Sequence, residues 1–77
     1  MHIKQKKPKW LDNELIYKKG DNVTNPFTGH TIYLNALELS IYDILIGAER
    51  VSDYDNVRKG RKWFATYSPV AYKILID

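Results

Sequence analysis

Three basic side chains and one tryptophan in the middle of the chain could bind an anion or a protein surface: Arg58, Lys59, Lys62 and Trp63. Residues three and four positions apart lie on the same face of a helix, so the three basic side chains would share one solvent-facing side. Basic side chains on one helix face can neutralise phosphates. Exposed aromatic side chains beside arginine are typical of protein interfaces. An ordinary solvated helix face fits the same pattern, so the four residues form a candidate interaction surface and no more.

A second group of basic side chains lies at the start of the chain, at Lys4, Lys6, Lys7 and Lys9. Residues 1–9 are polar and cannot bury much surface. We therefore expect a flexible basic arm, followed by a single small globular domain over residues 10–77. The arm and the basic helix together could hold nucleic acid through its phosphates. Asparagine and glutamine, which read adenine edges, are absent from the middle of the basic helix, which favours weak, sequence-independent binding.

No arrangement of residues in the sequence suggests catalysis. Ser40 and the other serines have structural explanations, His30 lies in a candidate strand, and no glycine-rich phosphate loop is present. Asp43 and Glu49 are six positions apart, a spacing that does not pair them on one helix face. The chain has no cysteine and only two histidines, which disfavours a zinc site. We expect no enzymatic activity, no cofactor and no metal.

Length and composition indicate one small globular domain. The chain has 77 residues, of which 44% are hydrophobic and 13% aromatic, a composition typical of folded chains. A domain of this size buries only about 60% of the surface of its unfolded chain, so aromatic side chains must supply much of the core. No apolar run reaches the roughly 18 residues of a membrane span, and none follows the charged start as in a signal peptide. We expect a cytoplasmic protein with no membrane partner.

The first part of the folded region is expected to form a small hairpin. Residues 14–18 are interpreted as a short strand or extended piece, which would pair with a strand at residues 30–34, where β-branched and aromatic side chains occur. Turn signals lie between them, at residues 19–22 and at residues 25–29, where a proline and a glycine suit a turn. Two strands alone are marginally stable in water, so this hairpin must pack on helices.

The sequence predicts a long helix over residues 36–51. Asn35 is a good N-cap, and Glu38 stands three residues later, as in a capping box. Apolar residues at helical spacing form one stripe: Leu37, Ile41, Ile44, Leu45, Ala48 and Val51. A second apolar side is a candidate self-interface of a homodimer: Leu39, Tyr42 and Ile46. This helix is expected either to lie centrally, with the hairpin on its second side, or to meet another chain.

Two further helices are expected towards the end of the chain. Ser52 or Asp53 can cap a helix over residues 54–67. The packing stripe of that helix, with Trp63 at its edge, consists of Val57, Gly60, Phe64 and Tyr67. Gly60 on this stripe fits either a close approach to another helix or tolerance of a poor helix former. A serine–proline pair at 68–69 begins a short third helix, with serine as N-cap and proline at the first helical position.

A series of short motifs, none of which has a recognisable catalytic or ligand-binding pattern, is spread over residues 24–77. The motifs are Asn25-Pro26-Phe27-Thr28-Gly29, Tyr42-Asp43, Gly47-Ala48-Glu49, Asp53-Tyr54, Val57-Arg58, Gly60, Trp63-Phe64, Pro69 and Ala71-Tyr72. Together they resemble a group of short proteins of no assigned function that are encoded by tailed phages of marine bacteria. The resemblance implies a phage origin, the cytoplasm of the host cell as location, and a small accessory role in infection. It leaves out the lysine-rich arm and carries over no catalytic or binding residue.

The fold class expected from these elements is α+β, with a small N-terminal β-hairpin packed on about three C-terminal helices and helix as the dominant structure. The leading functional expectation is a non-enzymatic protein-interaction module with an unknown protein partner, and the module could itself be a homodimer. Two alternatives stay open. One is weak, sequence-independent nucleic-acid binding, and the other is a self-assembling structural or virion component.

Overall fold

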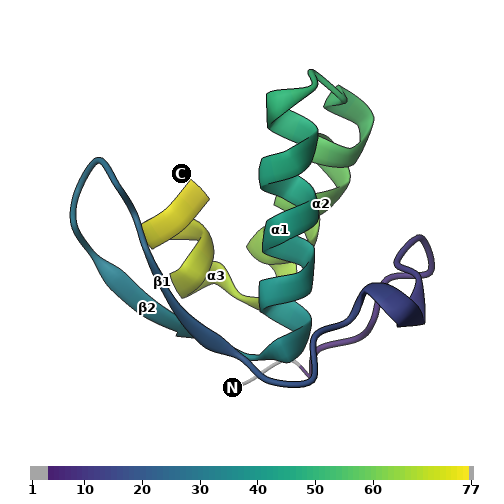
Figure 1. Cartoon of the computed structure of the whole chain (residues 1–77), viewed down its shortest axis with the longest axis horizontal. Coiled ribbons are helices and arrows are strands. Elements are labelled where there is room, and N and C mark those ends of the chain that lie inside the picture. The colour runs from purple at the N-terminus through teal and green to yellow at the C-terminus, as the bar shows by residue number, and fades with distance from the viewer. Residues whose placement is uncertain (1–3, 77) are drawn as a thin grey trace.

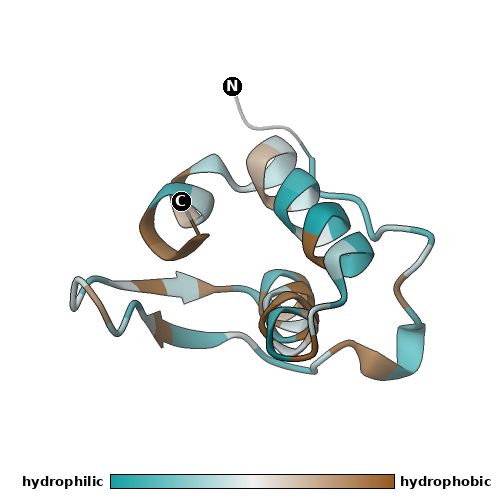
Figure 2. Cartoon of the chain, turned by 90° about the horizontal axis from the view of Figure 1, so that it is seen from above, coloured by the Kyte–Doolittle hydropathy of each residue, from teal (hydrophilic) through white to brown (hydrophobic). Residues whose placement is uncertain are grey.

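The chain folds into two layers of secondary structure, and the computed structural model describes residues 4–76. In chain order the elements are η1 (Asn13–Leu15), β1 (Asp21–Thr24), β2 (Thr31–Leu34), α1 (Ala36–Arg50), α2 (Tyr54–Tyr67), α3 (Pro69–Ala71) and the π-helical turn η2 (Tyr72–Ile76). Figure 1 and Figure 2 show the hairpin and α1 in one layer, and α2 with the C-terminal segment in the other. The predicted α+β fold, a small hairpin followed by three helices, is confirmed. Within the described residues, no helix combines the length and the apolar character needed to cross a bilayer.

The hairpin is closed by a loop at residues 25–30. β1 and β2 are antiparallel, with Val23 opposite Ile32. The side-chain oxygen of Asn25 accepts a hydrogen bond from the backbone N–H of Phe27 at 2.8 Å, and its backbone oxygen accepts one from Gly29 at 2.8 Å. Gly29 has a φ of 79°, a conformation that side chains other than glycine rarely adopt. The turn predicted at residues 25–29 is confirmed.

The predicted pairing of residues 14–18 with residues 30–34 is wrong, because β2 pairs with residues 21–24. This segment forms η1 and an extended stretch, and β1 begins inside the turn that was expected at residues 19–22. Short hairpin loops pair the segments that flank them directly, and here those segments lie on either side of residues 25–30. The 3-10 turn η1 has its own start signal, because the carboxylate of Asp12 accepts a hydrogen bond from the backbone N–H of Glu14 at 3.0 Å. Local capping therefore decides the structure of this segment.

The start of α1 carries the predicted capping box. The backbone N–H of Glu38 donates to Asn35 Oδ1 at 2.8 Å, and the backbone N–H of Asn35 donates to Glu38 Oε1 at 2.9 Å. Most of the predicted apolar stripe faces the core, and Leu45 is fully buried. Val51 is an exception and is 74% exposed, because α1 ends one residue before it, at Arg50.

The turn between α1 and α2 ends one helix and starts the next. The backbone N–H of Asp53 donates to the carbonyl oxygen of Ala48 at 2.8 Å, and that of Ser52 donates to Glu49 at 3.3 Å. This pair of bonds is the Schellman arrangement, in which the residue between the helices takes the left-handed conformation. Ser52 does so, with a φ of 57°. Asp53 is the N-cap of α2, since its carboxylate accepts from the backbone N–H of Asn56 at 3.4 Å.

Replacing Ser52 with glycine is expected to stabilise the fold. The left-handed conformation costs an L-residue roughly 1–2 kcal/mol, and the extra chain entropy of glycine in the unfolded state offsets part of that gain. We expect Ser52→Gly to raise the free energy of unfolding by about 0.5–1 kcal/mol, measured by urea denaturation. Ser52→Ala keeps the unfavourable φ and should bring no gain. A glycine variant less stable than the native chain would contradict this account of the turn.

The two layers meet closely where α2 crosses α1. A Cβ atom at Gly60 would lie 3.2 Å from the Cβ of Leu45, which is tighter than ordinary packing. The close-approach interpretation of Gly60 is therefore confirmed. Phe64 lies one turn further along α2 and is fully buried, in the same core as Leu11 and Leu34. The core thus draws on the segment before η1, the hairpin and both long helices.

The C-terminal segment is tied to both layers. Ser68 and Pro69 occupy the predicted first positions of α3, but the Ser68 side chain does not cap this helix. Its hydroxyl donates instead to the carboxylate of Glu38 at the start of α1. At the other end, the side-chain amide of Asn25 donates to the carbonyl oxygen of Ile74 at 2.9 Å. These two bonds hold the last helix against α1 and against the hairpin loop.

Candidate binding surface on α2 and the N-terminal arm

Helix α2 places its apolar and basic side chains on different sides. Trp63 is 5% exposed and belongs to the core, whereas Arg58, Lys59 and Lys62 are exposed. Asp55 in the first turn lies 3.2 Å from the guanidinium of Arg58 and 4.0 Å from the ammonium of Lys59. Such exposed pairs contribute little to stability. No ion pair of Lys62 is formed within residues 4–76.

Trp63 was expected to be exposed with these basic residues, and this expectation is wrong. Its indole Nε1–H donates to the carbonyl oxygen of Lys6 at 2.8 Å. Its ring lies 5.3 Å from that of Tyr67, at an angle of 41°. Helical spacing placed Trp63 at the edge of the apolar stripe, and the N-terminal arm passes over that edge and covers it. Trp63 therefore forms the base of the surface and does not protrude from it.

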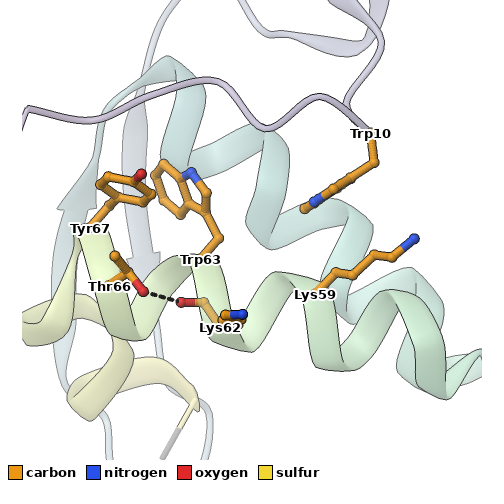
Figure 3. Close-up of a pocket in the computed structure, with 6 residues that line it drawn as sticks. All are labelled: Trp10, Lys59, Lys62, Trp63, Thr66 and Tyr67. Carbon is orange, nitrogen blue, oxygen red and sulfur yellow. Dashed lines mark hydrogen bonds between the residues drawn. The ribbon is translucent and has the colours of Figure 1, made fainter.

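The arm contacts the rest of the fold through Gln5. The side-chain amide of Gln5 donates to Glu38 Oε2 at 2.9 Å and to the carbonyl oxygen of Tyr67 at 3.4 Å. Its own side-chain oxygen accepts from the amide of Asn35 at 2.8 Å. Flexibility of the arm stays a prediction, and the part that concerns residues 1–3 lies outside the described residues. The contacts of Gln5 and of the Lys6 carbonyl lay the described part of the arm across α2 (Figure 3).

This placement concentrates positive charge on one side of the molecule. Residues 4–9 carry four lysines and no acid, and α2 carries four basic residues with Asp55 as its one acid. The two segments together have a net charge of +7, and because the whole chain has +3, the remaining residues have −4. Two basic segments that are far apart in the sequence thus lie side by side, and their combined charge attracts anionic partners.

A shallow depression of about 400 Å³ lies where the arm meets α2 (Figure 3). Its lining residues are Trp10, Lys59, Lys62, Trp63, Thr66 and Tyr67. Three aromatic rings supply apolar surface, and two lysines supply positive charge together with the apolar length of their side chains. The hydroxyl of Thr66 already donates to the carbonyl oxygen of Lys62 at 2.9 Å. The depression can hold an apolar side chain or a ring that has an anionic group beside it.

The predicted interaction surface and this depression overlap but are not identical. Three of the four predicted residues line the depression, and Arg58 does not. Tyr67 and Thr66 were missed, although Tyr67 lies four positions after Trp63, which is the spacing of one helix face. Trp10 was missed as well. It reaches the site through the path of the arm, for which the sequence gives no local signal.

The three residues of the predicted self-interface on α1 do not lie at one site in the structure. Tyr42 and Ile46 border a second hollow of about 430 Å³, enclosed by the hairpin loop, α1 and the C-terminal segment. Leu39 does not border this hollow and is partly buried against the core. Burial raises the pKa of the Tyr42 hydroxyl, and the negative charges of Glu49 and Asp43 raise this pKa further. The self-interface itself stays a prediction.

One other polar pair stands out on the exposed side of α1. The hydroxyl of Tyr17 donates to the carboxylate of Asp43. This hydrogen bond, and then the negative charge of the same carboxylate, raise the pKa of Tyr17. The pair fastens the segment after η1 to α1, together with a 2.8 Å bond from the Tyr17 backbone N–H to Ser40 Oγ. In the part of the chain that the structure describes, no three His, Cys, Asp or Glu side chains gather to hold a metal ion.

Several of the motifs that resemble phage-encoded proteins have structural roles in this fold. Residues 25–29 close the hairpin, Gly60 permits the close approach of the two long helices, and Trp63 and Phe64 belong to the core. The phage origin itself stays a prediction. No family model, no curated protein and no solved structure matches this chain.

Proposed function

We propose that this chain is a non-enzymatic protein-interaction module that binds an acidic segment of a partner protein in the depression between α2 and the arm. One observation carries the proposal: an aromatic hollow lined by Lys59 and Lys62 lies beside two segments that together have a net charge of +7. A partner segment that fits would place an apolar side chain in the hollow and carboxylates beside Lys59 and Lys62. The module lies in the cytoplasm, and in that of the host cell if a phage encodes it.

The two components of the surface have different physical roles. Apolar surface removed from water contributes about 25 cal/mol per Å², so the rings of Trp10 and Tyr67 supply most of the affinity. Exposed ion pairs contribute only about 0.2–1 kcal/mol each. Charge complementarity acts mainly on the association rate and on the choice of partner. The binding rate should therefore fall with added salt, while part of the affinity persists.

Charge reversal at the depression tests the proposal. The probe is a capped octapeptide that alternates aspartate with leucine, and its affinity is measured by titration calorimetry. Each reversal removes one attraction and adds one repulsion, so Lys59→Glu with Lys62→Glu should weaken binding at least about tenfold. Both side chains are exposed, so this double variant should keep its fold.

The matched control changes the same amount of charge elsewhere. Lys18 and Lys19 are exposed in the segment before β1 and do not border the depression. Lys18→Glu with Lys19→Glu should lower the affinity for the same peptide by less than about threefold, as expected for weak, screened interactions at a distance. An equal loss in both double variants would assign binding to net charge alone and reject the depression as the site.

A second candidate function is sequence-independent binding of single-stranded nucleic acid, favoured by the basic arm lying across α2, a helix that exposes basic side chains of its own. Contacts to phosphates release counterions, so log K falls with log salt at a slope of about −0.7 per phosphate for single strands. If the four arm lysines and the α2 bases all contact phosphates, replacing Lys4, Lys6, Lys7 and Lys9 by glutamine should make the slope about 3 units shallower. Affinity for a mixed oligonucleotide that does not depend on salt would exclude this candidate.

A further inference from the structure

The hollow bordered by Tyr42 and Ile46 lies away from the depression on α2, and the two share no lining residue. Its walls come from three places: the hairpin loop, the second half of α1 and the end of the C-terminal segment, which Figure 1 shows around one side of the molecule. Ile46 and Leu75 contribute apolar surface to its lining. Glu49 and Arg50, adjacent on the last turn of α1, add one negative and one positive charge to its lining.

Phe27 lies beside this hollow at the tip of the hairpin loop and is 96% exposed. Its position is fixed, because its backbone N–H donates to the side chain of Asn25, which in turn binds the carbonyl oxygen of Ile74. A loop held in this way presents a large apolar ring to water, where exposure is unfavourable. The loop therefore holds the backbone of Phe27 in place, and the apolar ring protrudes next to the hollow.

We propose that the occupant of this hollow is a second copy of the chain, and that the two copies exchange Phe27 side chains about a twofold axis. A twofold interface uses the same patch on both subunits, so that patch must be complementary to itself. This patch meets the condition in shape, since it contains both a protruding ring and a hollow. It meets the condition in charge as well, because Glu49 of one copy can face the partner's Arg50 and Arg50 can face the partner's Glu49.

The charges of the hollow support this arrangement. Neither Glu49 nor Arg50 forms an ion pair within residues 4–76, so both charges are available to a second copy. The strongly basic arm and α2 would repel their counterparts in a partner copy, and they lie outside the hollow. The dimer therefore leaves the depression on α2 open and presents two copies of it. It does not depend on the function proposed for that depression.

The size of the molecule is compatible with such a dimer. A standard interface covers about 800 Å² on each partner, which is about one seventh of the 5723 Å² exposed by this chain. The hairpin loop, the second half of α1 and the C-terminal segment together form one side of the fold (Figure 1). Contact across that side, centred on Phe27, would bury an aromatic anchor in a hollow, which is typical of the centre of stable interfaces.

The test is the solution mass, measured by light scattering at tens of micromolar of the full chain. The native chain should have twice the 9.0 kDa mass of one chain, and Phe27→Asp should have the monomer mass with unchanged circular dichroism, because Phe27 is almost fully exposed. Tyr54→Asp is the matched control, since Tyr54 is 71% exposed at the start of α2, away from the hollow, and should leave the dimer intact. A monomeric native chain, or a dimer that survives Phe27→Asp, would overturn the proposal.

A charge swap tests the twofold arrangement without touching Phe27. Glu49→Arg places two arginines of one copy against two of the other, and Arg50→Glu does the same with acids, so each variant should raise the dimer dissociation constant at least about tenfold. The double variant Glu49→Arg with Arg50→Glu restores the opposite charges and should recover most of the native affinity. Failure of the double variant to recover dimerisation would reject the pairing of Glu49 with the partner's Arg50.

Discussion

Phe64→Ala is expected to remove a large part of the stability of this domain. Phe64 is fully buried, and its ring meets those of Trp63 and Tyr42 edge-on, with centroids 5.3 and 6.4 Å apart. Truncating a buried phenylalanine costs about 3–5 kcal/mol, as transfer free energy and as the cavity that remains. A chain of this length has a total stability of only about 4–12 kcal/mol. Urea denaturation should show a greatly lowered midpoint or an unfolded variant.

Tyr54→Ala serves as the control for that measurement. Tyr54 is an aromatic residue on the same helix and is 71% exposed. Its truncation should change the free energy of unfolding by no more than about 0.5 kcal/mol. A loss of less than about 1 kcal/mol for Phe64→Ala would mean that the core is not organised around this ring.

Glu38→Ala should be the most destabilising substitution of a polar side chain. Glu38 is 8% exposed and accepts hydrogen bonds from three donors: the Asn35 backbone N–H, the Gln5 amide and the Ser68 hydroxyl. Loss of the capping box costs about 1 kcal/mol, and the partly buried hydrogen bonds to Gln5 and Ser68 contribute about 1–3 kcal/mol more. We expect a total loss of about 2–4 kcal/mol in the free energy of unfolding.

Two further variants separate the effect of these hydrogen bonds from that of charge. Glu38→Gln keeps one acceptor oxygen for Asn35 but turns an amide group towards other donors, so it should lie between the native chain and Glu38→Ala. Glu14→Ala removes an exposed carboxylate from η1 and should be close to neutral. Equal stability of Glu38→Ala and the native chain would show that the network is not part of the folding free energy.

The network also explains how the arm is held. Glu38 and Gln5 join the start of α1 to the arm, and the arm in turn covers Trp63. Release of Gln5 in Glu38→Ala should expose the indole of Trp63 to water. The fluorescence of Trp63, read in a Trp10→Phe background, should then shift to longer wavelength at urea concentrations where the domain is still folded.

The helices could be predicted from the sequence because their signals are local. Asn35 with Glu38, Asp53, and the serine–proline pair at 68–69 each lie at the start of the helix they were expected to begin. The turn at residues 25–29 is local in the same way. Such signals need only a few neighbouring residues, so one sequence is enough to recognise them.

The features that depend on distant contacts could not be predicted. Gln5 and Glu38 are 33 positions apart, and Lys6 and Trp63 are 57 positions apart. Helical spacing alone left Trp63 at the border of the apolar stripe, and only the path of the arm decides that it is buried. The same path brings Trp10 to the depression and places two basic segments side by side.

The first strand was mispredicted because two local signals competed. Apolar residues in 14–18 favour a strand, whereas Asp12 favours a helical turn at η1. Because the hairpin loop has only six residues, the segments that directly flank it pair as the two strands. Ser68 shows a similar competition, since a serine before proline suits an N-cap, but the buried carboxylate of Glu38 takes its hydroxyl.

The most direct test of the proposed function is a map of chemical-shift changes in the ¹⁵N-labelled chain on addition of the aspartate–leucine octapeptide. The chain has two tryptophans, and both line the depression, so their indole N–H signals report on the site. The proposal predicts that the largest changes occur at the indoles of Trp10 and Trp63 and at the amides of residues 59–67. The proposal would be contradicted if these signals did not change, or if the largest changes centred on the hairpin loop at residues 25–30.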